Sequence, residues 1–259
     1  MKWKSVFLLI ISLLCISFPV HAKSSLAELD ELADEALKLT KFSKLEEAKL
    51  SLERFGELFS EQGIMENQFT MDELRILTAA HHNALNAVTS VSLNQDERIR
   101  QVTSFRLATD AVMSKYQPLW VGMKGSVLNS FRAVKNAALQ GDAVLYNQQL
   151  NDFLAIYSVI QPSIKIDVSV EKVQMLDSKV AFIDNSRTAF SEEAWLQELD
   201  SFEVDLQKLF TDFDEDDTDP SIWWVIIMTG SIIVSTLSYV SWRKYRGQKV
   251  QKKKRDLDD

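Results

Sequence analysis

The 259-residue chain is acidic, with 37 acidic and 29 basic residues and a formal net charge of −8. The excess of acid lies in residues 23–219, which hold 34 acidic and 19 basic residues; this argues against nucleic-acid binding, because affinity for phosphate comes from Lys and Arg. The only cysteine, Cys15, lies in the N-terminal apolar segment, so a disulfide framework, a thiolate metal site and a cysteine nucleophile are excluded for the rest of the chain.

The first 22 residues have the pattern of a secretory signal peptide. Lys2 and Lys4 precede an apolar run over residues 6–18, and Val20-His21-Ala22 fits the small-residue cleavage pattern. We therefore expect cleavage near Ala22. An uncleaved anchor is the alternative, although this run is short for a membrane span.

Residues 23–211 are predicted to fold as one all-helical extracytoplasmic domain. Glycine and proline are scarce in this region, which leaves room for long helices. Apolar residues recur at intervals of three and four, as they do on the buried face of a helix. The predicted helices cover residues 25–41, 44–61, 71–91, 95–116, 118–139, 142–160, 168–184 and 191–211.

Four capping signals mark expected helix starts. In each, a small polar side chain can accept a hydrogen bond from the backbone of a glutamate three positions later. The pairs are Ser25 and Glu28, Ser43 and Glu46, Thr70 and Glu73, and, in a weaker form, Asn94 and Glu97.

Three stripes of apolar residues need partners, so we expect the helices to pack on one another. The stripes are Leu45, Ala48, Leu52, Phe55 and Phe59; Tyr146, Leu150, Phe153, Tyr157 and Ile160; and Trp195, Leu199, Phe202, Leu206 and Leu209. The predicted fold class is all-α: an irregular multi-helix bundle or short α-solenoid, plus one C-terminal transmembrane helix. After Pro162, the alternation of Ile164, Ile166 and Val168 predicts a short extended segment that leads into the next helix.

The sequence has no motif for catalysis or cofactor binding, and we expect a protein that is not an enzyme and has no metal or cofactor. His81 and His82 are adjacent, so on a helix they point about 100° apart and cannot bind one metal as an i, i+4 pair would. We expect His81 to face the core and His82 to face solvent. Asp212, Asp214 and Asp216 have the spacing of the first calcium-loop ligands, but the glycine and glutamate that such a loop requires are absent.

An uncharged stretch of 21 residues, 222–242, predicts a membrane-spanning helix. At about 1.5 Å per residue it extends about 31 Å, enough to cross a hydrocarbon core of about 30 Å. We expect an acidic juxtamembrane linker over residues 212–220, the transmembrane helix over 221–242 and a basic tail over 243–259. The expected membrane-interface anchors are Trp223, Trp224, Tyr239 and Trp242.

The charges around the span predict its orientation. The tail has eight basic and three acidic residues, whereas residues 212–219 have six acidic residues and no basic one. The positive-inside rule therefore places the tail in the cytoplasm and the N-terminal domain outside, in a single-pass protein of the cell membrane. The residues expected to determine this topology are Arg243, Lys244, Arg246 and Lys249.

Small residues within the span would allow a second helix to approach closely. They recur at intervals of three and four and comprise Gly230, Ser231, Ser235 and Ser238. A homodimer formed through this helix is therefore an open alternative to a monomeric span.

Several segments resemble the sporulation protein YpjB family. Near the C-terminus they are Asp219-Pro220-Ser221-Ile222, Trp224-Val225-Ile226-Ile227, Thr229-Gly230-Ser231-Ile232-Ile233, Tyr239-Val240 and Arg243-Lys244-Tyr245. Earlier in the chain they are Pro118-Leu119-Trp120, Tyr157, Pro162-Ser163-Ile164 and Ile166-Asp167-Val168-Ser169. The resemblance implies a sporulation-associated membrane protein of an endospore-forming, Bacillus-like bacterium. It supplies no catalytic or binding residues.

A membrane-tethered protein-interaction module is the function that these features favour. Its partners would be the lipid bilayer and an envelope protein that the sequence does not name. The alternative is a single-pass sensor or accessory subunit that passes a signal to a membrane or cytoplasmic partner. A tail of 17 residues is too short for a signalling domain, so this alternative requires such a partner.

Overall fold

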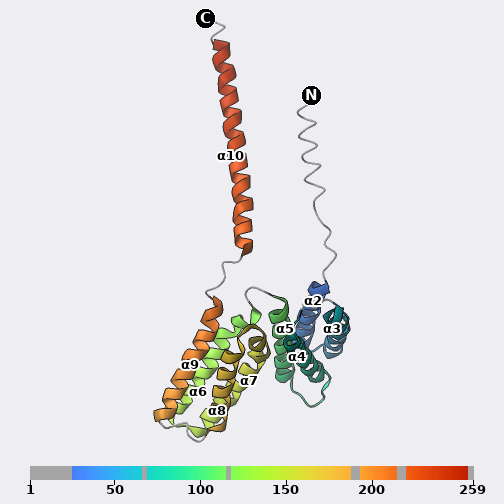
Figure 1. Ribbon diagram of the computed structural model, residues 1–259, viewed down its shortest axis with the longest axis vertical. Coiled ribbons are helices and arrows are strands. Elements are labelled where there is room, and N and C mark those ends of the chain that lie inside the picture. The colour runs from blue at the N-terminus through green and yellow to red at the C-terminus, as the bar shows by residue number, and fades with distance from the viewer. Residues whose placement is uncertain (1–24, 66–68, 115–117, 188–192, 215–219, 256–259) are drawn as a thin grey trace. The chain divides into compact units, whose positions relative to one another are not determined.

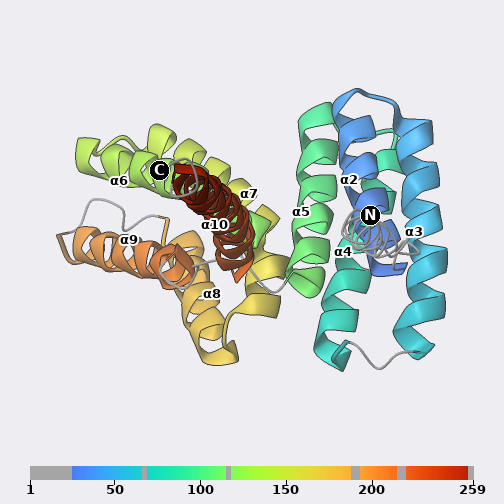
Figure 2. The same cartoon turned by 90° about the horizontal axis from the view of Figure 1, so that it is seen from above.

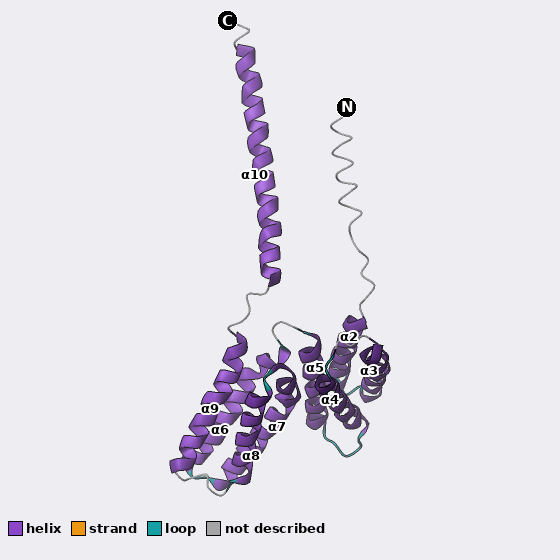
Figure 3. Ribbon diagram, in the orientation of Figure 1, coloured by secondary structure: helices purple, strands orange, loops and turns teal. Residues whose placement is uncertain are grey.

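Every element of the computed structural model is a helix, which confirms the predicted all-α fold class (Figure 3). The chain divides into two compact units, Met1–Thr211 and Asp212–Asp259. The predicted signal peptide, residues 1–22, lies outside the described part of the chain. The residues that the structure describes are 25–65, 69–114, 118–187, 193–214 and 220–255 (Figure 1).

The first four helices form one bundle. They are α2 (Ser25–Lys41), α3 (Leu45–Met65), α4 (Met71–Thr89) and α5 (Gln95–Met113). Because α2 and α4 each contact both α3 and α5, the four helices enclose a common core (Figure 2). Its fully buried side chains include Leu29, Leu52, Phe55, Leu77 and Phe105.

Four further helices form a second group, with an aromatic core. They are α6 (Lys124–Gln140), α7 (Ala143–Asp167), α8 (Val170–Asn185) and α9 (Glu193–Asp214). The ring centroid of Phe131 lies 5.0 Å from that of Phe153 and 5.0 Å from that of Phe202. These three rings come from α6, α7 and α9, so their contacts pack α9 against two helices that come earlier in the chain.

The two groups of helices meet where α4 and α5 contact α7. A short 3-10 helix, η1 (Leu119–Met123), lies at this junction and contacts α5, α6 and α7. Its Trp120 is fully buried, with its ring 5.5 Å from that of Phe210 in α9. The predicted helix over residues 118–139 is therefore divided into η1 and α6.

The helix α7 continues through Pro162 to Asp167, so the predicted extended segment after Pro162 is wrong. Ile164 lies inside α7 and Val168 is its C-cap residue, four positions later, and both are buried. The alternating pattern is misleading because packing of these residues decides the conformation. The backbone N–H of Val168 donates to the carbonyl of Ile164, which closes the last turn.

Two of the predicted helix caps are present. The Thr70 hydroxyl accepts a hydrogen bond from the Glu73 backbone N–H (3.2 Å), and the Glu73 carboxylate accepts one from the Thr70 backbone N–H (2.6 Å). This reciprocal pair is a capping box. Asn94 Oδ1 accepts a hydrogen bond from the Glu97 backbone N–H (2.8 Å) and caps α5.

The sequence predicts that Ser43 caps the start of α3. In the structure it instead terminates α2. Its φ is +58°, in the left-handed region. Its N–H donates to the carbonyl of Thr40 (2.9 Å), and the N–H of Lys44 donates to that of Leu39 (3.0 Å), which is the Schellman arrangement. Gly141 holds the equivalent position after α6, with a φ of +69°. Serine thus occupies a backbone position that favours glycine.

Ser43→Gly is expected to raise the free energy of unfolding by about 1 kcal/mol, because the left-handed region costs a residue with a Cβ roughly 1–2 kcal/mol. The matched reverse change, Gly141→Ser, should lower it by a similar amount. Urea denaturation of the full chain in detergent, followed by circular dichroism, measures both. Destabilisation by Ser43→Gly would contradict the assigned role of the residue.

Candidate functional site

The helix α10 (Pro220–Arg255) contains a 22-residue stretch, Trp224–Tyr245, that is long and apolar enough to cross a membrane. It extends about 33 Å, and its large apolar side chains are between 44% and 68% exposed. A helix that is apolar on all sides is typical of a membrane span or of the centre of a large core. The stretch covers the predicted span, residues 221–242, except for its first three residues.

Aromatic side chains lie at both ends of the apolar stretch. Trp224 is exposed at its beginning, and Tyr239, Trp242 and Tyr245 are exposed toward its end. Trp223, the remaining predicted interface residue, belongs to α10, but its side chain lies outside the described part. The aromatic residues thus have the two-ended arrangement of an interfacial belt.

The basic residues predicted to set the topology lie in the same helix, at the C-terminal end of this stretch and beyond it. Arg243 and Lys244 are exposed, whereas the side chains of Arg246 and Lys249 are not described. The helix does not stop at the predicted end of the span but continues to Arg255. The span and most of the basic tail therefore form one continuous helix.

The hydroxyl groups of Thr229, Ser231 and Thr236 each donate a hydrogen bond to a carbonyl of the preceding turn. Such internal pairing is what a hydrocarbon environment demands of polar groups. Three of the four predicted packing residues share a side of α10. At about 100° per residue, Ser231, Ser235 and Ser238 lie within about 60° of one another, whereas Gly230 lies about 80° from Ser238 and about 140° from Ser235.

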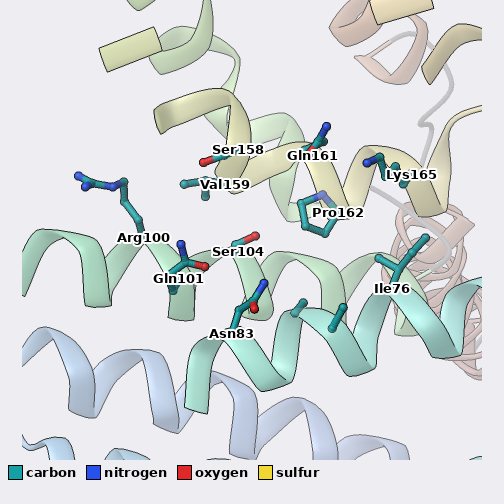
Figure 4. A pocket seen from close by; sticks show the side chains of 12 residues that line it. Ile76, Asn83, Arg100, Gln101, Ser104, Ser158, Val159, Gln161, Pro162 and Lys165 are labelled. Atoms are coloured by element: carbon teal, nitrogen blue, oxygen red, sulfur yellow. The ribbon is translucent and has the colours of Figure 1, made fainter. Parts of the chain in front are cut away.

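In the other unit, a cleft of about 340 Å³ lies between α4, α5 and α7 (Figure 4). Part of its wall is apolar and includes Ile76, Ala80, Val159 and Pro162. The polar part consists of neutral groups and two basic residues: Asn83, Arg100, Gln101, Ser104, Ser158, Gln161 and Lys165. This is the size and mixed character of a small ligand-binding site.

The two cations of the cleft, which Figure 4 shows at opposite ends, already have acidic partners. Arg100 Nε donates to Glu97 Oε2 at 3.0 Å, and Lys165 Nζ lies 3.5 Å from Asp177 Oδ2. A hydrogen bond from Gln101 is the largest cause that lowers the pKa of Glu97, so this acid stays ionised at neutral pH. Each positive charge is therefore balanced locally.

At the cleft, one side-chain hydroxyl makes no internal hydrogen bond and one backbone carbonyl lacks its usual helical donor. Ser104 is only 8% exposed, yet its hydroxyl makes no hydrogen bond within the described structure. Pro162 has no backbone N–H, so the carbonyl of Ser158, four residues earlier, lacks its usual helical donor. The cleft thus has hydrogen-bonding capacity that the fold does not use.

His81 packs into the first bundle and His82 is exposed, as the sequence predicts. The Nε2 atom of His81 lies 2.7 Å from the carbonyl oxygen of Leu52, and its ring stacks on Phe55. Burial is the main cause that lowers the pKa of His81, so the imidazole is neutral near pH 7. Among the described residues, no group of three or more His, Cys, Asp or Glu side chains could hold a metal ion.

Two partly buried carboxylates lie beside η1. The indole N–H of Trp120 donates to Asp167 Oδ2 (2.7 Å), and the backbone N–H of Leu119 donates to Asp110 Oδ2 (2.7 Å). Burial raises the pKa of Asp167 to about 6; the Trp120 hydrogen bond opposes this rise, and the charges of Asp110 and Glu73 add to it. The carboxyl group of Asp167, which accepts the hydrogen bond from Trp120, therefore changes its charge near pH 6.

The comparisons with known proteins identify the family. The family model described as "Sporulation protein YpjB (SpoYpjB)" matches residues 26–254. The chain is 30% identical over 261 residues to the "Uncharacterized protein YpjB" of Bacillus subtilis (strain 168), and the alignment covers 99% of each chain. The chain therefore belongs to the sporulation protein YpjB family, which implies an association with sporulation. No solved structure matches it.

The apolar stretch of α10 is predictable from the sequence, whereas the cleft is not. The residues that form the cleft come from three separate stretches, 76–83, 100–104 and 158–165, and none of them belongs to a known binding motif. The available signal was Pro162, a proline within a segment whose flanking residues favour a helix. A proline usually marks a helix end, so the sequence predicts neither its position inside α7 nor the cleft beside it.

Asp167→Asn is expected to raise the free energy of unfolding at pH 7 by about 1–2 kcal/mol. The carboxyl group has a higher pKa in the folded chain, about 6, than its ordinary value of 3.8. Its contribution to stability is therefore fully present below about pH 3.8 and is lost as the pH rises through about 6. The asparagine Oδ1 retains an acceptor for Trp120 without the buried charge.

Urea denaturation at several pH values between 4 and 8 measures this difference. The gain in stability should be small near pH 4 and reach its full size above pH 6. The exposed Asp152 provides a control, since Asp152→Asn should leave stability nearly unchanged at every pH. A gain that does not vary with pH would contradict the assignment to Asp167.

Proposed function

We propose that this protein is a membrane-anchored extracytoplasmic helical protein that acts as a non-enzymatic interaction module in sporulation. The observation that carries the proposal is the apolar, exposed surface of α10 over Trp224–Tyr245. Exposure of so much apolar surface to water is costly, at roughly 25 cal/mol per Å². A bilayer would cover all sides of this helix at once, and the length of about 33 Å suits it.

The charge distribution supports one orientation. Arg243 and Lys244 lie at the C-terminal end of the apolar stretch, and six more basic residues lie beyond them, whereas acidic residues dominate before the stretch. Under the positive-inside rule, the tail is cytoplasmic and the helices before α10 are outside. The N-terminal sequence with its cleavage pattern near Ala22 agrees with export of these helices.

Several charged side chains of the helical unit that have shifted pKa values form ion pairs between helices, which fits a non-enzymatic role. Lys135 of α6 contacts Glu203 of α9, and Lys179 of α8 contacts Asp205 of α9 at 2.6 Å. Burial lowers the pKa of Lys135, but the hydrogen bonds that it donates to its acidic partners give a net rise. The hydrogen bond that Lys179 donates to Asp205 is the largest cause that raises its pKa. These perturbed groups hold helices together, which supports a structural role for them rather than acid–base catalysis.

One observation favours a second candidate, a single-pass accessory subunit that relays a signal. The helix α10 runs without interruption from Pro220 to Arg255. A continuous helix can carry a rotation or shift from one membrane face to the other. In that case the basic end of α10 would bind a cytoplasmic or membrane partner.

The proposed orientation predicts the activity of alkaline phosphatase fusions, since this enzyme requires an oxidising compartment. Fused after Asp216, alkaline phosphatase should be active; fused after Lys254, it should be inactive. Immunoblotting of both fusions controls for abundance. The reverse pattern would refute the topology, and equal activity of both fusions would refute a single span.

A further inference from the structure

We propose that the cleft between α4, α5 and α7 binds a short extended peptide segment of a partner protein. This inference rests on the proposed interaction function and assigns a docking site to it. Residues of both helix groups line the cleft, so a bound segment would contact both (Figure 4).

The Ser104 hydroxyl is the first argument for a ligand. It lies in the wall of the cleft on a side chain that is more than nine-tenths buried, and it makes no hydrogen bond within the described structure. The Ser104 oxygen is not fully enclosed, so without a ligand its hydrogen bonds go to water in the cleft and to no internal group. A ligand with a polar group at this point would satisfy it.

The Ser158 carbonyl is the second argument. Pro162 occupies the interior of α7, where proline costs about 3 kcal/mol and leaves the carbonyl four residues earlier without its donor. Both Ser158 and Pro162 line the cleft. The residue that removes the usual helical donor and the residue that carries the affected carbonyl therefore lie together at the cleft.

Two carboxamides add further acceptors with fixed positions. Gln101 Nε2 donates to Glu97 Oε1, and Gln161 Nε2 donates to Asp177 Oδ1, both at 2.8 Å. These bonds orient the side chains and leave both carbonyl oxygens without a donor among the described residues. Together with Ser158 and Ser104, the cleft is rich in acceptors, so its ligand should supply N–H donors.

An extended peptide meets these requirements. Its backbone supplies regularly spaced, neutral N–H donors, and each carbonyl can accept in turn from Ser104 or Asn83. The balanced charges of Arg100 and Lys165 favour a neutral ligand over an anion. Small apolar side chains of the segment would contact Ile76 and Val159, and a volume of about 340 Å³ accommodates only a short segment.

The test uses the full chain in lipid nanodiscs and a phage-displayed library of random heptapeptides. Enriched peptides are synthesised, and their dissociation constants are measured by fluorescence anisotropy. Ala79→Trp places a large ring in the cleft from an exposed position of α4, and should weaken binding at least about tenfold by excluding the peptide. Thr78→Trp is the matched control, because Thr78 is exposed on the same helix but does not line the cleft.

Ser104→Ala removes the hydroxyl with little change of shape and should weaken binding by about three- to tenfold, the effect of one neutral hydrogen bond. Circular dichroism and thermal denaturation verify the folding of each variant. The proposal is overturned if no peptide is enriched, or if the enriched peptides bind Ala79→Trp as tightly as the unaltered chain. Binding of an N-acetylglucosamine oligomer in place of peptides, with loss in Ala79→Trp, would also overturn it and assign the cleft to a carbohydrate.

Failure of this proposal is distinguishable from failure of the proposed function. The phosphatase fusions test the membrane topology and do not depend on the cleft. If the fusions behave as expected but the cleft binds no peptide, the anchored interaction module remains and its docking surface lies elsewhere. If the fusions show the reverse orientation, the interaction function fails even if isolated peptides bind.

Discussion

The helical unit depends on the burial of α5 on more than one side. This helix contacts α2, α4, α7 and η1, and the six consecutive residues 104–109 are all buried. A helix at the surface of a bundle buries one stripe, whereas a helix in the middle buries residues around most of its circumference. Because α5 belongs to the first bundle and also contacts α7, it joins the two helix groups.

Burial of this run places a charge in the interior. Arg106 is 8% exposed, with its guanidinium 3.0 Å from Asp30 and 3.3 Å from Asp34, both on α2. A buried charge without partners would be prohibitively costly, so the acidic residues of α2 are required where α5 is enclosed. The resulting ion pairs fix the position of α2 against α5.

The same central position of α5 gives rise to the cleft. Phe105 faces the first core, with its ring 4.8 Å from that of Phe55, while the adjacent Ser104 faces α7. Successive residues of a helix point about 100° apart. Because α5 is buried on more than one side, a polar residue such as Ser104 lies at a contact with another helix. At this contact, α7 contributes Pro162 and the carbonyl of Ser158 instead of a fully bonded helical surface. The unused hydrogen-bonding groups therefore follow from the packing of α5 together with one proline.

Local and periodic signals predicted most of the fold. Residues of the predicted stripes such as Phe55, Tyr146 and Phe202 are fully buried, and Thr70 caps its helix, because helical spacing and capping are encoded within a few residues. A serine followed three residues later by a glutamate is a typical helix start signal, so the sequence predicts that Ser43 begins a helix. Its positive φ instead results from how α2 ends, which this local pattern does not encode. The cleft forms between three stretches of the chain that lie far apart within residues 76–165, and no local pattern specifies how they pack. The apolar stretch of α10 was predictable, since length and composition alone define it.

The most direct test of the account is site-specific photocrosslinking of the full chain in sporulating cells, since the account holds that the helical unit contacts the partner and α10 anchors it. A photoreactive amino acid is placed at Ala79, beside the cleft, or at Tyr245, at the basic end of the span, with the exposed Val204 as a control. We predict a reproducible protein adduct from Ala79 and none from Tyr245 or Val204. An adduct from Tyr245 with none from Ala79 would contradict the account and assign the interaction to α10.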